Sequence, residues 1–156
     1  MESASSMFDW TAMSKLDQTP QNEAATAAYA KIADLEEAPR KKELMAAIET
    51  VYHLPDPQLR SMTEARLRAW LALPPEKASL VGNSFESVMD EGPADIAMRR
   101  VTIVQSVASK LTAEEITQLR RVVPRVLGDA PPVTASMSAG TGDPPPPWWA
   151  FWRKRN

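Results

Sequence analysis

The last nine residues, 148–156, are the part of the chain whose residue types and spacing most clearly indicate a binding chemistry. Three of the five tryptophans fall here, directly before three consecutive bases. The aromatic residues are Trp148, Trp149, Phe151 and Trp152, and the bases are Arg153, Lys154 and Arg155. Tryptophan favours the headgroup zone of a bilayer because one end of its ring is apolar and the other donates a hydrogen bond. We therefore expect this segment to dock on a surface.

Three surfaces fit such a segment: an anionic membrane, a groove on a protein partner, and the chain's own helical domain. On lipid, each base adds about 1 kcal/mol and each partly buried aromatic about 1.5 kcal/mol. The sum resembles that of one acyl chain, which binds reversibly and needs a second anchor. Tryptophan and arginine are also the commonest hot-spot residues of protein interfaces. Stacking on single-stranded nucleic acid is the least favoured partner chemistry.

A second candidate binding surface is a basic face formed by arginines of the two last predicted helices. Its members are Arg99, Arg100, Arg120, Arg121 and Arg125. Such a face would suit acidic partners or phosphates, whereas a solvated helix surface is the simpler interpretation.

Residues for catalysis, metal binding or cofactor binding are scarce. The chain has no cysteine and a single histidine, His53, so cysteine-based metal sites and a serine–histidine triad have little to draw on. The carboxylate pairs at 36–37 and 114–115 are adjacent in helical segments and therefore do not face each other. No glycine-rich phosphate loop or dinucleotide fingerprint occurs. We expect no catalytic, cofactor-binding or metal-binding residues, no cofactor, and a protein that is not an enzyme.

The formal net charge of −2 is unevenly distributed along the chain. Residues 1–39 carry seven acids and two bases, whereas residues 93–128 carry six bases and three acids. A domain that wraps duplex DNA would be far more basic, so nucleic acid is an unlikely partner. The absence of cysteine fits a reducing compartment. With no signal-like start and no run of roughly 20 apolar residues, we expect a cytoplasmic protein, with the inner face of a membrane as its peripheral site.

The elements that must position these residues are predicted to be helices. Apolar residues recur at helical spacing, as in Ala25, Ala28, Tyr29 and Ile32, and no segment alternates with a period of two. From Asn22 onward the helices are predicted up to Pro39, then over about 40–54, 57–73, 76–91 and 95–111, and from a capping box at Thr112–Glu115 to about 126. The most apolar of them, 95–111, is expected at the centre of the bundle.

A faint internal repeat relates residues 40–62 to residues 97–119 at an offset of 57. It pairs Leu44 with Val101 and Met62 with Leu119. A true repeat would predict two related helical hairpins. Chance matching of helical periods is the alternative explanation.

Four regions follow from these patterns. Residues 1–20 form a flexible or weakly amphipathic arm, residues 21–128 a helical domain, residues 129–147 a Pro/Ala/Ser/Gly-rich linker, and residues 148–156 the docking tail. The predicted fold class is all-α, a compact bundle of about five to six amphipathic helices.

The expected function is that of a non-enzymatic adaptor or scaffold. Its helical domain binds a protein partner, and its tail docks reversibly on a membrane surface or a membrane-bound complex. The alternative is a soluble regulatory or assembly factor whose tail is a recognition peptide for a protein partner.

Overall fold

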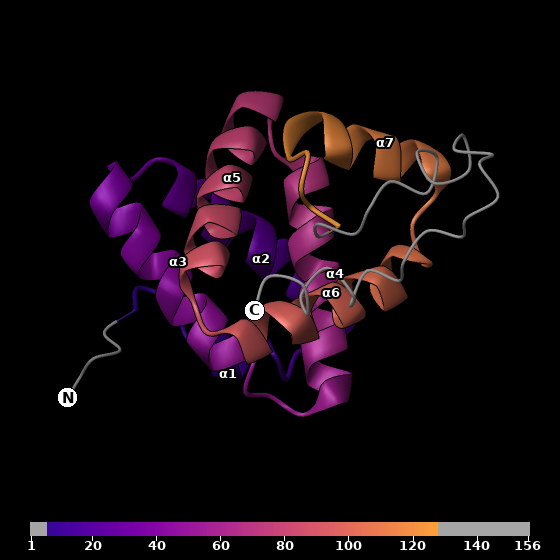
Figure 1. Ribbon diagram of the computed structural model, residues 1–156, viewed down its shortest axis with the longest axis horizontal. Helices are drawn as coiled ribbons and strands as arrows, with labels where there is room; N and C mark the ends of the chain where they lie inside the picture. Colours follow the sequence, from indigo (N-terminus) through magenta and orange to yellow (C-terminus); the bar gives the residue numbers. More distant parts are fainter. Residues whose placement is uncertain (1–5, 128–156) are drawn as a thin grey trace, which may run out of the picture.

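The computed structural model describes residues 6–127, and within this range the chain forms seven α-helices and no strand (Figure 1). The helices are α1 Trp10–Met13, α2 Gln18–Ala33, α3 Glu37–Val51, α4 Asp56–Ala72, α5 Pro75–Glu91, α6 Ala94–Ala108 and α7 Ala113–Val122. The predicted all-helical, compact class is confirmed.

The helix starts follow local sequence signals closely. Thr112 Oγ1 accepts a hydrogen bond from the amide of Glu115, and the carboxylate of Glu115 accepts one from the amide of Thr112. The predicted capping box is therefore present at the start of α7. Proline opens α4 and α5, where the amide hydrogens of the first turn have no partner within the helix.

Pro39 was expected to end the first long helix, and this prediction was wrong. Helix α2 ends at Ala33, and Pro39 lies in the first turn of α3, which begins at Glu37. A proline is tolerated there because the N–H groups of the first turn have no carbonyl acceptor within the helix, so the missing N–H of proline costs no hydrogen bond. The backbone then continues normally, with the amide of Arg40 donating to Glu36 O at 2.8 Å.

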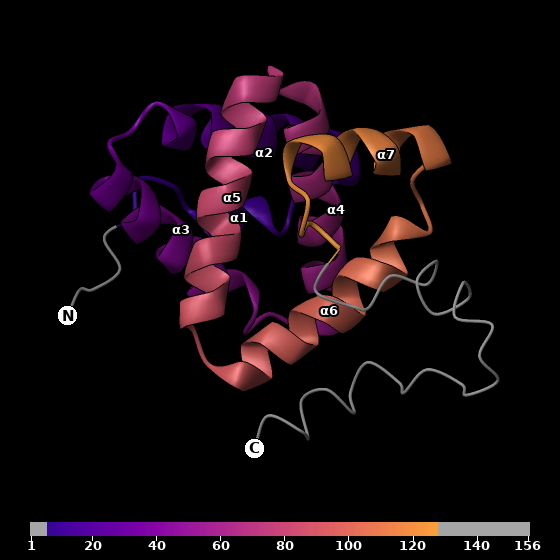
Figure 2. The ribbon, with the colours of Figure 1, turned by 45° about the horizontal axis from the view of Figure 1, so that its top comes forward.

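The helices pack mainly on their second neighbours along the chain. The main contacts join α2 to α4, α3 to α5 and α4 to α6, and α5 also packs on α7. Figure 2 shows the same order, with α5 between α3 and α7. By contrast, neither α3 with α4 nor α6 with α7 is a substantial contact pair, so the two segments of the faint repeat do not form two closed hairpins.

Helix α4, and not α6, is the central helix. Helix α4 contacts α2, α5, α6 and α7, and nine of its seventeen residues are buried. Helix α6 lies at the edge in Figure 2, and its Met98 is 41% exposed. The expectation of a central 95–111 helix was wrong because its buried apolar residues lie on one side only, namely Val101, Ile103, Val104, Val107 and Ala108.

The N-terminal segment packs into the core. Trp10 of α1 is 2% exposed and belongs to a row of ring contacts that runs from Phe8 through α2 and α4 to α5. Ring centroids lie 5.7 Å apart for Trp10 and Tyr29, 5.9 Å for Tyr29 and Trp70, and 5.4 Å for Trp70 and Phe85. Residues 8–13 of the predicted arm thus pack on the domain, with a short helix over Trp10–Met13.

Candidate docking site

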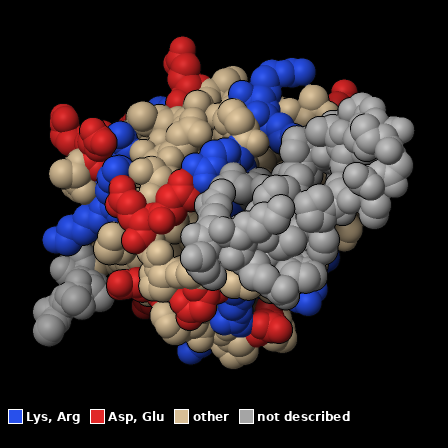
Figure 3. Space-filling model, viewed as in Figure 1, with Lys and Arg blue, Asp and Glu red and all other residues tan. Residues whose placement is uncertain are grey.

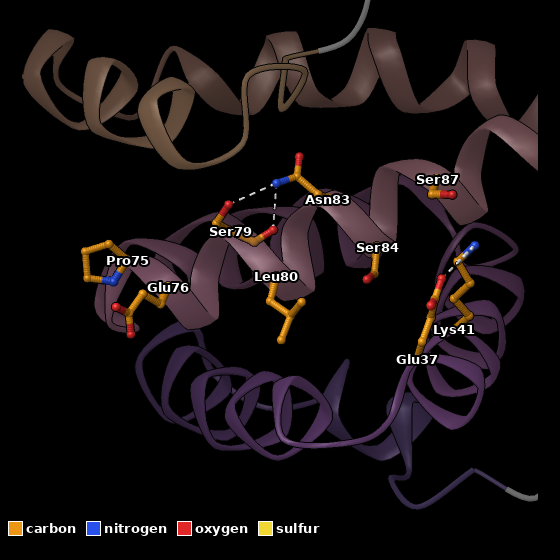
Figure 4. A pocket seen from close by; sticks show the side chains of 9 residues that line it. All are labelled: Glu37, Lys41, Pro75, Glu76, Ser79, Leu80, Asn83, Ser84 and Ser87. Carbon is orange, nitrogen blue, oxygen red and sulfur yellow. Dashed lines mark hydrogen bonds and ion pairs between the residues drawn. The ribbon is translucent and has the colours of Figure 1, made fainter.

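An open groove lies between α3 and α5, with a volume of about 680 Å³ (Figure 4). Its lining consists of Glu37 and Lys41 from α3 and of Pro75, Glu76, Ser79, Leu80, Asn83, Ser84 and Ser87 from α5. Leu80 points into this space and is 43% exposed, which makes it one of the few large apolar side chains on the described surface. The groove therefore combines an apolar floor with hydroxyl and carboxylate groups.

Helix α5 positions the groove through its two unlike faces. Glu76, Leu80, Ser84 and Ser87 follow one another at intervals of four, four and three residues, so they line one side of the helix. The opposite side is buried and includes Val81, Phe85 and Val88. The core thus holds α5 in place while its polar side remains open beside α3.

Arg40 fastens the two walls of the groove together. Its guanidinium is buried and donates from Nε to Ser84 Oγ at 2.9 Å and from Nη1 to Leu35 O at 2.8 Å. Both bonds begin on α3, and the first crosses to α5. The spacing of the walls is consequently fixed by a charged hydrogen bond beneath the surface.

The surface charges along the groove are predominantly acidic. Lys41 Nζ lies 3.9 Å from Glu37 Oε2 and 3.8 Å from Glu91 Oε2, so one ammonium group is shared between two carboxylates. Glu76 is exposed and has no ion-pair partner within residues 6–127. Ion pairs at such distances on a surface are weak, which leaves these carboxylates free to bind an incoming cation.

The segment that follows α7 is fixed to α5 and α6. Val123 and Val126 are fully buried, and Val123 packs directly against Gly82 of α5. Arg100 Nη2 donates to Arg125 O at 2.9 Å and to Val126 O at 3.4 Å. The end of the described chain is therefore held at a defined place on the domain.

Two ion pairs strengthen this anchor. Arg100 pairs with Glu86 in the interior; burial raises the pKa of the Glu86 carboxyl, and the charge of Arg100 opposes that rise. Arg125 and Asp90 form a bidentate pair on the surface, with Nη1–Oδ2 at 2.6 Å and Nη2–Oδ1 at 2.7 Å. The hydrogen bond from Arg125 lowers the pKa of Asp90.

A buried arginine marks the middle of the core. Arg66 is 3% exposed, donates from Nη1 to Tyr52 Oη at 3.2 Å, and has its guanidinium carbon 4.3 Å from the Phe85 ring centroid. Its Nε and Nη2 have no hydrogen-bond partner in the described protein. The void beside it measures about 10 Å³, which is room for roughly one water molecule and not for a substrate.

The residues predicted to form a basic face have different surroundings. Arg100 is buried, and Arg125 is paired with Asp90. Arg99 is half-buried, where it donates to Tyr52 O at 2.7 Å and to Asp56 Oδ1 at 2.6 Å and so ties α6 to the link between α3 and α4. Arg120 and Arg121 are exposed at the end of α7. Of the five arginines, only these last two are exposed, and the five do not form one basic face.

Basic and acidic side chains are interspersed over the face seen in Figure 3. His53 is exposed in the turn that follows α3, and its Nδ1 lies 2.5 Å from Glu49 O of that helix. Within residues 6–127, no three histidine, aspartate or glutamate side chains gather closely enough to hold a metal ion. No helix in this range is long and apolar enough to cross a bilayer.

The predicted docking residues, Trp148, Trp149, Phe151, Trp152, Arg153, Lys154 and Arg155, lie outside the described residues, as does the linker 129–147. The groove was missed by sequence reasoning. Its only sequence signal is that Leu80 stands within an otherwise polar row, Glu76, Ser84 and Ser87, at helical spacing.

Comparison of the chain with protein-family models, with curated protein sequences and with solved structures found no match.

Proposed function

We propose that the protein is a non-enzymatic adaptor or scaffold that docks reversibly on an anionic membrane surface, or on a membrane-bound complex, through residues 148–155. The observation that carries the proposal is the composition of this segment: four aromatic residues followed directly by three bases. Aromatic rings enter the headgroup zone, and the bases bind anionic lipid. The proposal places the protein on the cytoplasmic side of the membrane.

The affinity of the tail argues for a second contact. Four aromatics at about 1.5 kcal/mol each and three bases at about 1 kcal/mol each give an affinity near that of one acyl chain. One such anchor is reversible, and stable attachment takes two. We assign the second contact to the helical domain, which would bind a protein partner. The fixed segment at Val123 and Val126 supports this division, because it gives the linker a rigid origin.

Membrane docking can be tested with the full chain and phosphatidylserine–phosphatidylcholine vesicles. We expect co-sedimentation that falls with added salt and is lost on deletion of residues 144–156. Tryptophan emission should shift to the blue, and the shift will report on the tail because Trp10 and Trp70 are 2% and 1% exposed in the core.

A matched pair of variants distinguishes binding through the tail from nonspecific attraction of any exposed base to the membrane. Arg153→Gln/Lys154→Gln/Arg155→Gln should weaken binding, whereas Arg120→Gln/Arg121→Gln should not, although it removes two exposed bases of the domain. Unchanged emission on addition of vesicles would contradict the proposal. If binding to a purified protein partner is instead lost on Trp149→Ala or Trp152→Ala without any lipid, the tail is a recognition peptide.

A further inference from the structure

We propose that the groove between α3 and α5 is a binding site for aromatic–basic peptide segments, and that its occupant is residues 148–155 of the same chain. The groove would hold the tail when no membrane is present, and an anionic membrane would compete for it. The competition rests on the proposed membrane docking, whereas occupancy of the groove does not.

The chemistry of the groove matches that of the tail. Leu80 and Pro75 offer an apolar surface to an indole ring, and the hydroxyl groups of Ser79 and Ser87 can accept a hydrogen bond from an indole N–H. A tryptophan placed here would cover Leu80, which is otherwise 43% exposed. Burial of that contact is the apolar part of the binding free energy.

Charge complementarity points in the same direction. Glu37 and Glu76 line the groove, and Glu91 adjoins it through Lys41. The side chain of Glu37 is 74% exposed and that of Glu91 is 61% exposed, so both remain accessible to an arriving guanidinium. The three consecutive bases at the end of the tail would pair with these carboxylates.

The segment that follows α7 crosses α5 close to the groove. Asn83 lines the groove, and its Nδ2 lies 3.4 Å from Val122 O at the end of α7. Val123 then packs on Gly82, the neighbour of Asn83 on α5. The described chain ends at Leu127, just after the carbonyls of Arg125 and Val126 that Arg100 of α6 holds, so the tail would return across α5 to reach the groove.

The connecting segment is long enough to allow the return. Residues 128–147 separate the fixed segment from Trp148 and could span up to roughly 60 Å if fully extended. A domain of this size has a radius of gyration of about 14 Å, so the groove is well within reach. Tethering of this kind gives an effective concentration on the order of 1 mM, so even a weak groove would be filled in a large share of molecules.

The absence of cysteine makes a direct test possible. Ser87→Cys places one thiol in the groove of the full chain for labelling with bimane, a fluorophore that tryptophan quenches on contact. The label should be quenched, and replacing Trp148, Trp149 and Trp152 by Phe should raise its emission about twofold or more, as expected when half or more of the molecules are closed. A label at Thr19→Cys, exposed on α2, is the matched control and should not respond.

Further variants test the chemistry of the site. Glu37→Gln/Glu76→Gln and raised salt should each relieve the quenching, since both weaken the charge pairing. Leu80→Ser should relieve it without altering net charge. Quenching that grows with protein concentration would mean that the tail of a second copy fills the groove, which would overturn the intramolecular proposal.

The vesicle measurement distinguishes the two proposals. Anionic vesicles should brighten the Ser87→Cys label while neutral vesicles should not. If the label is quenched by the tail but anionic vesicles change nothing, the groove proposal stands and the membrane proposal fails. Equal emission with and without the three tail tryptophans would refute occupancy of the groove, whatever the vesicles do.

Discussion

Gly82 allows the segment that follows α7 to pack directly against α5. A Cβ atom at this position would overlap Val123 Cγ2 and would lie 3.3 Å from Val123 Cβ and Cγ1. Val123 has little freedom to yield because Val126 is fully buried and Arg100 holds the carbonyls of Arg125 and Val126. The glycine is thus required for close packing and not for an unusual backbone angle.

Gly82→Ala should therefore destabilise the protein, although alanine is the better helix former. The propensity gain is about 1 kcal/mol, and overpacking costs roughly 1–3 kcal/mol, so we expect a net loss measured by urea unfolding. In a Val123→Ala background both Cγ atoms are absent, and the same Gly82→Ala change should become stabilising. An equal effect in both backgrounds would contradict the observed contact.

The limits of sequence analysis are clear for individual arginines. Arg99, Arg100 and Arg125 look alike in the sequence, yet one bridges a loop, one is buried against Glu86 and one pairs with Asp90. Each partner is distant in the chain, so no local spacing could have identified it. For Leu80, the polar row on its own helix could be recognised in the sequence. The packing of α3 beside that row, which makes the groove, could not.

At the scale of elements, helix α1 shows how a short segment becomes part of the core. It has only four residues, too few for independent stability, and it is held by the side chain of Asp9 at its N-cap and by the burial of Trp10 and Met13. Glu43 of α3 adds a further tie, accepting hydrogen bonds from Ser6 Oγ at 2.8 Å and from the amide of Met7. Tertiary contacts, and not helix propensity, fix this segment.

Trp10→Ala should cost about 3–5 kcal/mol of unfolding free energy, the usual penalty for removing a buried tryptophan. Met7→Ala, in the same segment but 56% exposed, is the matched control and should change stability by no more than about 0.5 kcal/mol. Chemical denaturation of both variants provides the measurement. A small loss for Trp10→Ala would mean that the arm is only loosely attached.

Helix boundaries were predictable where the signal is local, and helix positions were not. The capping box and the prolines at the starts of α4 and α5 act within one helical turn, so these helix starts could be predicted from the local sequence. The central place of α4 was hidden because Glu64 and Arg66 suggest a wet face. Both are buried: Glu64 pairs with Arg68 at 3.0 Å, whereas Arg66 has one hydrogen bond, to Tyr52, and lies over the Phe85 ring. A paired charge can occupy a core that its residue type alone argues against.

For the whole molecule, packing between second neighbours interlocks the helices. Helix α2 packs on α4, α3 on α5, α4 on α6 and α5 on α7. No group of consecutive helices can therefore unfold without exposing the buried face of a helix that stays folded. Two separate hairpins, as the faint repeat suggested, would instead meet at one interface and could melt apart. The topology therefore predicts that the domain unfolds as one unit, which could not be predicted from the sequence.

We accordingly expect one cooperative unfolding transition for the helical domain. The variant with Trp148, Trp149 and Trp152 replaced by Phe leaves Trp10 and Trp70 as the only tryptophans, one on α1 and one on α4. Urea unfolding followed by their emission should coincide with unfolding followed by far-ultraviolet circular dichroism, which reports on all helices, including α6 and α7. The two midpoints and slopes should agree, with a slope of about 1–3 kcal/mol per molar urea. If the emission changed first while much of the helical signal persisted, α6 and α7 would form an independent unit, and the interlocked packing would not govern stability.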